Sequence, residues 1–125
     1  MTVFLDSDIL IEVSRAKNAD IISQWLELSD SDAAVLYSPI SVAELWAGAR
    51  PNEHEAITNL FHVLTCMPID QQMGHLAGVY LQQYRRSHNV EVADAFIAAS
   101  AVASKAALWT RNRKHYPMKE ISFFE

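Results

Sequence analysis

Short apolar runs of strand length alternate with longer amphipathic segments along this chain, and this alternation limits the fold more than any other feature. Because strands separated by helices need crossover connections, the sheet should be mostly parallel and covered by helices on both faces. The sequence therefore predicts an α/β fold, a three-layer α/β/α sandwich with a four- or five-stranded sheet. Strands are predicted over residues 2–5, 33–37, 64–69, 106–109 and 121–124, and helices over residues 8–13, 21–28, 39–49, 53–63, 70–86 and 92–104.

The length and composition favour one domain that covers residues 1–125. A chain of 125 residues suits a single core, and no stretch rich in Gly, Pro or Ser indicates a linker. The start lacks the basic region of a secretory signal, and no apolar run approaches the length of a membrane span. Cys66, the only cysteine, excludes an internal disulfide and is predicted to be a small buried hydrophobe. We therefore expect a soluble cytoplasmic protein without a membrane partner.

The charge is unevenly distributed along the chain. The net charge of −5 argues against a protein that coats nucleic acid through bulk electrostatics. Residues 85–119, however, carry seven Lys and Arg against two acidic residues. This segment either presents a local basic face to phosphates or forms a solvated charged surface, and the charge alone leaves both interpretations open.

Three carboxylates stand at the end of a predicted strand or inside the predicted helix that follows: Asp6, Glu44 and Asp94. In a parallel sheet the carboxyl ends of the strands lie along one edge, where ligands bind. Asp94 joins the other two only if its helix begins at that edge. Clustered carboxylates repel one another unless a cation lies between them, and hard oxygen ligands favour Mg²⁺ or Mn²⁺. The pattern predicts a metal-dependent hydrolase.

Each of these carboxylates also has a purely structural explanation. Asp6 is placed to cap the first helix, and Asp94 near a helix start is favoured by the helix dipole. The spacing of Ser41 and Glu44 matches a capping box. Pro39 argues against that box, because a proline at the first helical position puts Glu44 too deep in the helix to reach back to the cap.

Four segments occur in the order and spacing of a PIN domain: Leu-Asp-Ser-Asp-Ile-Leu at 5–10, Ser-Val-Ala-Glu-Leu at 41–45, Ala-Asp-Ala-Phe-Ile-Ala-Ala at 93–99, and Leu-Trp-Thr-Arg-Asn-Arg-Lys-His-Tyr at 108–116. Over residues 2–124 the chain resembles the PIN domain family, and in particular the VapC toxins of type II toxin–antitoxin systems. The resemblance implies an α/β/α sandwich and an endoribonuclease that hydrolyses RNA phosphodiester bonds with Mg²⁺ or Mn²⁺. It also implies a cognate VapB-type antitoxin as partner and a homodimer.

By this resemblance, Asp6, Glu44 and Asp94 are the catalytic and metal-binding residues. Asn112 stands where many relatives have Asp, and His115 stands near another position that is often acidic. With three formal negative charges, the departure leaves open whether one or two ions bind.

Further residues are expected to support the site. Ser7 and Thr110 are predicted to orient the ligands as hydroxyl donors, and Asn112 to accept a metal-bound water through its amide oxygen. Three basic residues just after the fourth strand are predicted to contact RNA phosphates, with a solvated loop as the alternative. They are Arg111, Arg113 and Lys114.

Two other functions fit part of the sequence. An apolar strand followed by Asp6-Ser7-Asp8 resembles the start of a haloacid dehalogenase-like phosphatase with Asp6 as nucleophile, which explains Asp8 better but Glu44 and Asp94 worse. Otherwise Asp8 and Glu12, one helical turn apart, are predicted to form a solvated face. The other alternative is a PIN-like RNA- or protein-binding module without turnover.

Overall fold

The sheet of the computed structural model, which describes residues 1–125, contains five parallel strands in the order β3-β2-β1-β4-β5. The central strand β1 pairs with β2 on one side and β4 on the other, with Val3 opposite both Val35 and Ala107. The parallel five-stranded sheet confirms the predicted architecture. The strands are β1 (Thr2–Leu5), β2 (Ala34–Tyr37), β3 (Thr65–Cys66), β4 (Ala107–Trp109) and β5 (Ser122–Phe123).

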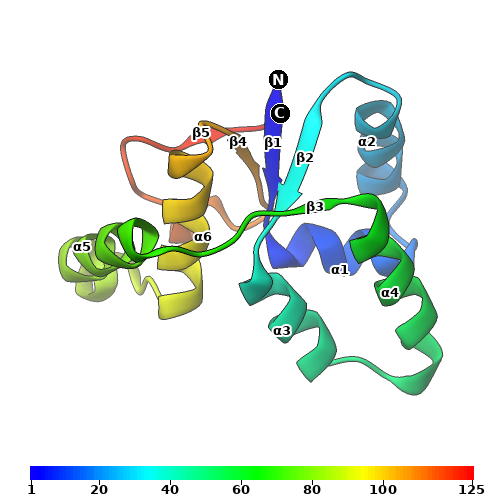
Figure 1. Cartoon of the computed structure of the whole chain (residues 1–125), viewed down its shortest axis with the longest axis horizontal. Coiled ribbons are helices and arrows are strands. Elements are labelled where there is room, and N and C mark those ends of the chain that lie inside the picture. Colours follow the sequence, from blue (N-terminus) through cyan, green and yellow to red (C-terminus); the bar gives the residue numbers. More distant parts are fainter.

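Five of the six α-helices cover the two faces of the sheet (Figure 1). In Figure 1, α5 and α6 lie on one side of the sheet and α1, α2 and α4 on the other, while α3 lies beyond the ends of the strands. None of these helices combines the length and apolar character that crossing a bilayer requires. The helices are α1 (Ser7–Arg15), α2 (Ala19–Ser29), α3 (Pro39–Ala47), α4 (His54–Val63), α5 (Gln71–His88) and α6 (Val92–Ala103), with short 3₁₀ turns η1 (Pro51–Glu53) and η2 (Arg113–His115).

The core is divided by the sheet because successive side chains of a strand point to opposite faces. Phe4 and Leu108 pack against α5 and α6, whereas Val3, Leu5 and Trp109 pack against the helices of the other layer. On α5 an apolar stripe of Met73, Ala77 and Tyr80, at intervals of four and three residues, is buried in the first of these clusters. The stripe therefore belongs to the core.

The helix starts follow the capping pattern of the sequence. Ser38 caps α3, its hydroxyl oxygen accepting the N–H of Ile40 at 3.0 Å, and Pro39 occupies the first helical position. Asp70 caps α5 by accepting the N–H of Met73 at 2.9 Å. Since Ser38 is the cap of α3, Glu44 lies in the helix interior and takes no part in a capping box, as Pro39 predicted.

The third strand departs from the prediction. The expected strand over residues 64–69 is reduced to Thr65–Cys66, and Cys66 is exposed, so its predicted burial is wrong. β3 is an edge strand that pairs only with β2. An edge strand is covered on one side only, and Pro68 has no N–H with which to extend the pairing.

Candidate functional site

The carboxyl ends of β1, β2 and β4 lie along one edge of the sheet, where α1, α3 and α6 begin (Figure 1). The backbone N–H of Asp6 donates to the carbonyl of Trp109 at 3.0 Å, which joins the ends of β1 and β4. Asp94, in the first turn of α6, lies 3.5 Å from Nδ1 of His115, which follows β4. The start of α6 therefore lies at the edge where the sequence analysis required it.

Asp6 is buried at this edge and fixed through both carboxylate oxygens. Its Oδ1 accepts the N–H of Ser7 at 2.7 Å, and its Oδ2 accepts the hydroxyl of Thr110 at 2.8 Å. The hydroxyl oxygen of Thr110 in turn accepts the N–H of Asn112 at 3.0 Å. Asp6 is also the N-cap of α1. Capping and a place in the site are thus compatible.

Glu44 is held by a chain of two hydroxyl groups. Oγ of Ser7 lies 2.6 Å from Oε1 of Glu44 and 2.8 Å from Oγ of Ser41, which is fully buried. An ionised carboxylate only accepts hydrogen bonds, so Ser7 donates to Glu44 and accepts from Ser41. This chain ties α3 to the start of α1 next to Asp6. Sequence reasoning did not single out Ser41 as a site residue.

Asp94 and the loop after β4 form the other side of the site. Oδ2 of Asp94 accepts the N–H of Glu91 at 3.0 Å and lies near His115. Burial raises the pKa of Asp94, while the hydrogen bond from Glu91 opposes that rise. Nδ2 of Asn112 lies 3.0 Å from Nδ1 of His115, so the amide at the altered fourth position contacts the imidazole.

Asp8 is a further candidate site residue, although its spacing from Glu12 predicts a solvated face. Its two carboxylate oxygens accept the N–H groups of Ile9 at 2.8 Å and Arg111 at 2.9 Å. Burial, and then the negative charge of Asp6, raise the pKa of Asp8 to about 6. The solvated-face prediction is therefore wrong for Asp8. In the sequence, the position of Asp8 two residues after Asp6 was the feature that could have indicated a place in the site.

Tyr116 is a second residue that the sequence did not indicate. Its side chain is buried and its hydroxyl has no hydrogen-bond partner. Burial, followed by the charges of Asp6 and Asp94, raises its pKa, which keeps the hydroxyl protonated. An O–H donor therefore lies close to the carboxylates. No local periodicity distinguishes this tyrosine from a core aromatic.

The donor set consists of carboxylate oxygens, whose chemistry fits a hard divalent cation. The charge of Asp6 raises the pKa of both Asp8 and Asp94, so these side chains interact electrostatically. No three acidic, His or Cys side chains converge on one point that would hold an ion. Glu44 is bonded to Ser7 and Asp94 to the N–H of Glu91. These residue types therefore suit Mg²⁺ or Mn²⁺ as ligands, but their side chains do not converge into a complete coordination site.

The three basic residues after β4 differ in what they contact. Nη1 of Arg111 lies 3.6 Å from Oε1 of Glu12. The guanidinium of Arg113 lies 4.8 Å from the ring centre of Phe123 and pairs with Glu125 at 3.3 Å, so it contacts the C-terminal segment. Lys114 is exposed and makes no ion pair. Of the three, Arg111 lies closest to the carboxylates through its N–H bond to Asp8.

Comparisons with known proteins agree with this architecture. The family model described as PIN domain matches residues 3–121. The chain is 34% identical over 119 residues to Ribonuclease VapC10 of Mycobacterium tuberculosis, covering 94% of this chain and 88% of the relative.

Two solved structures share the fold. VapBC2 of Rickettsia felis, bound to a DNA fragment from its promoter, superposes with a TM-score of 0.83 at 17% identity, over 99% of this chain and 98% of the other. VapBC-1 of nontypeable Haemophilus influenzae superposes with a TM-score of 0.79 at 22% identity, over 100% and 98% of the two chains.

Proposed function

The chain belongs to the PIN domain family, and on that premise we propose that it is an endoribonuclease toxin of the VapC type, which hydrolyses RNA phosphodiester bonds and is neutralised by a VapB-type antitoxin. The relative from Mycobacterium tuberculosis is named a ribonuclease, and the solved structures of similar fold are VapBC complexes. Family membership removes the phosphatase alternative. The observation that carries the proposal is that Asp6, Glu44 and Asp94 come from three separate segments and lie at one edge of the sheet.

We propose that Asp6, Asp94 and Glu44 hold Mg²⁺ or Mn²⁺. When bound, the ion supplies a Lewis acid for the scissile phosphate and lowers the pKa of a coordinated water. The carboxylate donor set and the effect of the Asp6 charge, which raises the pKa of both Asp8 and Asp94, support a cation at this edge. Whether one or two ions bind depends on Asn112, whose amide contacts His115.

The residues around the carboxylates position them for hydrolysis. The hydroxyl of Thr110 fixes Asp6, and the chain from Ser41 through Ser7 fixes Glu44. We expect Asp94 or Asp6 to orient the attacking water and accept its proton. The buried hydroxyl of Tyr116 is a donor for a carboxylate or a bound water at the same edge.

Arg111 and Lys114 are proposed to neutralise the phosphates that flank the scissile bond. Arg113 is less free to do so, because its guanidinium already contacts Phe123 and Glu125. The proposal therefore ranks Arg111 and Lys114 above Arg113 as RNA contacts.

The antitoxin is proposed to cover the acidic edge in the cytoplasm, where a free toxin would damage the cell's own RNA. An arginine of the antitoxin would pair with the carboxylates and compete with the metal for the same negative charge. Homodimerisation stays a prediction. Of the apolar residues of α5, Met73, Ala77 and Tyr80 are buried in the core and are not available to its interface.

Cleavage of a panel of single-stranded and structured RNAs tests the proposal, with Mg²⁺, with Mn²⁺ and with EDTA. We expect cleavage only with metal, and a loss of about 100-fold or more in Asp94→Asn because the carboxylate is removed from the site. Asp20→Asn is the matched control, since Asp20 is exposed on α2. Equal activity in both variants would place the site elsewhere. RNA binding without any cleavage would favour the binding module without turnover.

A further inference from the structure

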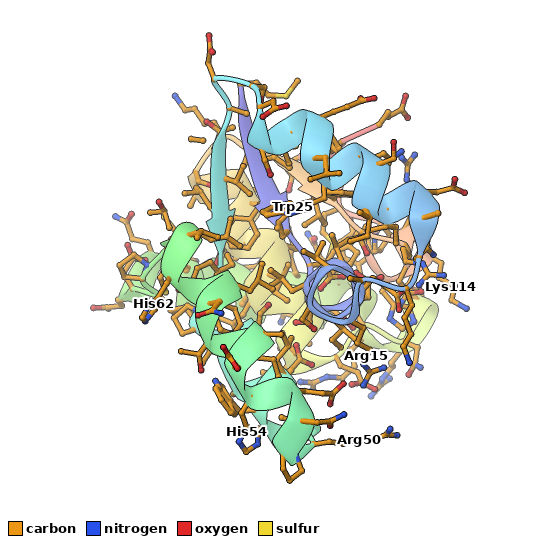
Figure 2. The ribbon with its side chains drawn as sticks, turned by 90° about the vertical axis from the view of Figure 1, so that its right-hand side faces the viewer. Arg15, Trp25, Arg50, His54, His62 and Lys114 are labelled. Atoms are coloured by element: carbon orange, nitrogen blue, oxygen red, sulfur yellow. The ribbon has the colours of Figure 1, made fainter.

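A polar hollow of about 450 Å³ lies between the end of α1, η1 and the start of α4. Figure 2 shows Arg15 and Arg50 at this corner of the molecule. The charged lining of the hollow consists of three cations and two carboxylates, and only one of the eight residues that line it is apolar. The charged residues are Arg15, Lys17, Arg50, Glu12 and Glu53.

This hollow lies next to a depression that reaches Glu44. A smaller depression of about 40 Å³ shares Ser14, Arg15 and Glu53 with the hollow and has Glu44 in its wall. Ser7 and Arg15 are the first and last residues of α1, so they lie about 12 Å apart along the helix axis. A strand of a few nucleotides therefore spans the distance from the carboxylates to the hollow.

Charged side chains of both signs follow one face of α1 toward the hollow. Asp8, Glu12 and Arg15 are spaced by four and three residues, which places them on one side of the helix. The guanidinium of Arg111 pairs with Glu12, between the two ends of this row. The route from the site to the hollow thus passes Arg111 and then reaches Arg15.

The cations of the hollow keep hydrogen-bonding capacity for a ligand. Nε of Arg15 donates to Oε2 of Glu53 at 3.0 Å, which orients the guanidinium and leaves its terminal nitrogens free. Glu53 also accepts the N–H of Arg50 at 3.0 Å, and the bonds from Arg50 and Arg15 hold the pKa of Glu53 below its usual value. Neither Lys17 nor the guanidinium of Arg50 takes part in an ion pair.

We propose that this hollow binds backbone phosphates of the RNA strand to one side of the scissile bond, with Arg50 and Lys17 as direct contacts and Arg15 oriented toward the strand by Glu53. This inference rests on the proposed function and extends it to a second RNA-binding site. Guanidinium groups match the geometry of phosphate oxygens. A protein segment that docks through apolar anchors finds only Ala56 in this lining.

The test measures binding of 5′-labelled single-stranded RNA of mixed sequence and roughly 20 nucleotides, a length that exceeds a single binding site. All variants carry Asp94→Asn so that the RNA stays intact. We expect Arg50→Gln to weaken binding about 3- to 10-fold and to reduce the salt slope by about 0.7, the value for one phosphate contact on a single strand. Arg86→Gln is the matched control, because Arg86 is exposed at the end of α5 and makes no ion pair.

A short RNA separates the hollow from the catalytic edge. An RNA dinucleotide, whose single phosphodiester lies at the edge, is expected to be cleaved equally by Arg50→Gln and the unsubstituted protein, because it does not reach the hollow. Equal binding of the long RNA by Arg50→Gln and Arg86→Gln would overturn the inference while leaving the nuclease intact. Weaker antitoxin binding with unchanged RNA binding would overturn it in favour of a protein site. Absence of both cleavage and RNA binding in the unsubstituted protein would instead reject the proposed function.

Discussion

At the scale of single residues, the hydroxyl chain that holds Glu44 is open to a direct test. Ser41 is fully buried and acts only through Ser7, so it is a positioning residue. We expect Ser41→Ala to lower kcat about 10-fold with little change in KM. Losses of this size are typical when a residue that supports a metal ligand through hydrogen bonds is removed. Steady-state RNA cleavage checks this. Ser100→Ala is the control, since Ser100 is equally buried but bonds to the carbonyl of Phe96 in its own helix. An equal loss of kcat in both variants would contradict the positioning role.

The raised pKa of Asp8 predicts a pH dependence of stability. Between pH 3.8 and about 6 the folded protein keeps a proton on Asp8 that the unfolded chain releases. The free energy of unfolding therefore falls as the pH rises through this window, and the loss is complete above about pH 6. After allowing for the partial exposure of Asp8, we expect this contribution to be about 1–2 kcal/mol.

Urea denaturation in EDTA at a series of pH values measures this contribution. Asp8→Asn lacks the titration, so the stability of the variant relative to the unsubstituted protein should increase from pH 4 to pH 7. A difference between the two proteins that stays constant over this range would show that Asp8 titrates normally in the folded state.

At the scale of elements, the cap of α5 is expected to contribute to stability without affecting the site. Asp70→Ala removes the acceptor for the N–H of Met73 and should cost about 1 kcal/mol, or about 3–5 °C in Tm. RNA cleavage should be unchanged, because Met73 meets Ser100 in the second half of α6, whereas Asp94 is in its first turn. Thermal unfolding followed by circular dichroism checks the prediction. Asp70→Asn retains an acceptor and should stay within a few tenths of a kcal/mol of the original.

Most elements followed from the sequence because their signals are local. Ser38 and Pro39 mark the start of α3, and Asp70 marks the start of α5, within a few residues of each helix. The predicted length of the third strand was too great because its length is not set by a local signal. Its length depends on pairing with β2 alone at the edge of the sheet, which no pattern within residues 64–69 specifies.

At the scale of the whole molecule, a bound cation should stabilise the fold by joining helices from both layers. Mg²⁺ or Mn²⁺ at a hundred times its Kd would add about 2.7 kcal/mol to the free energy of unfolding if it binds only the folded chain. The increase in Tm should be lost in Asp94→Asn and kept in Asp20→Asn. Thermal scans with metal and with EDTA give this result without measuring cleavage. An equal increase in both variants would indicate a general ionic effect.

At this scale too, local sequence patterns were enough to predict the alternation of strands and helices, the parallel sheet, the family resemblance, and Asp6, Glu44 and Asp94 as candidate site residues. These follow from periodicity, caps and short motifs, each of which involves residues that are close in the sequence. The contacts of these carboxylates depend instead on the packing of distant segments. Ser7 reaches Glu44 across 37 positions and Thr110 reaches Asp6 across 104.

The environments of Asp8 and Tyr116 were likewise set by tertiary packing. Asp8 accepts a hydrogen bond from the N–H of Arg111, 103 positions away, and Tyr116 is buried beside Asp6. Burial and electrostatic repulsion depend on which segments the fold brings together, and a pattern of neighbouring residues does not contain that information. The sequence therefore located the edge of the sheet where the site forms, and the packing of distant segments decided the charge and the hydrogen bonds within it.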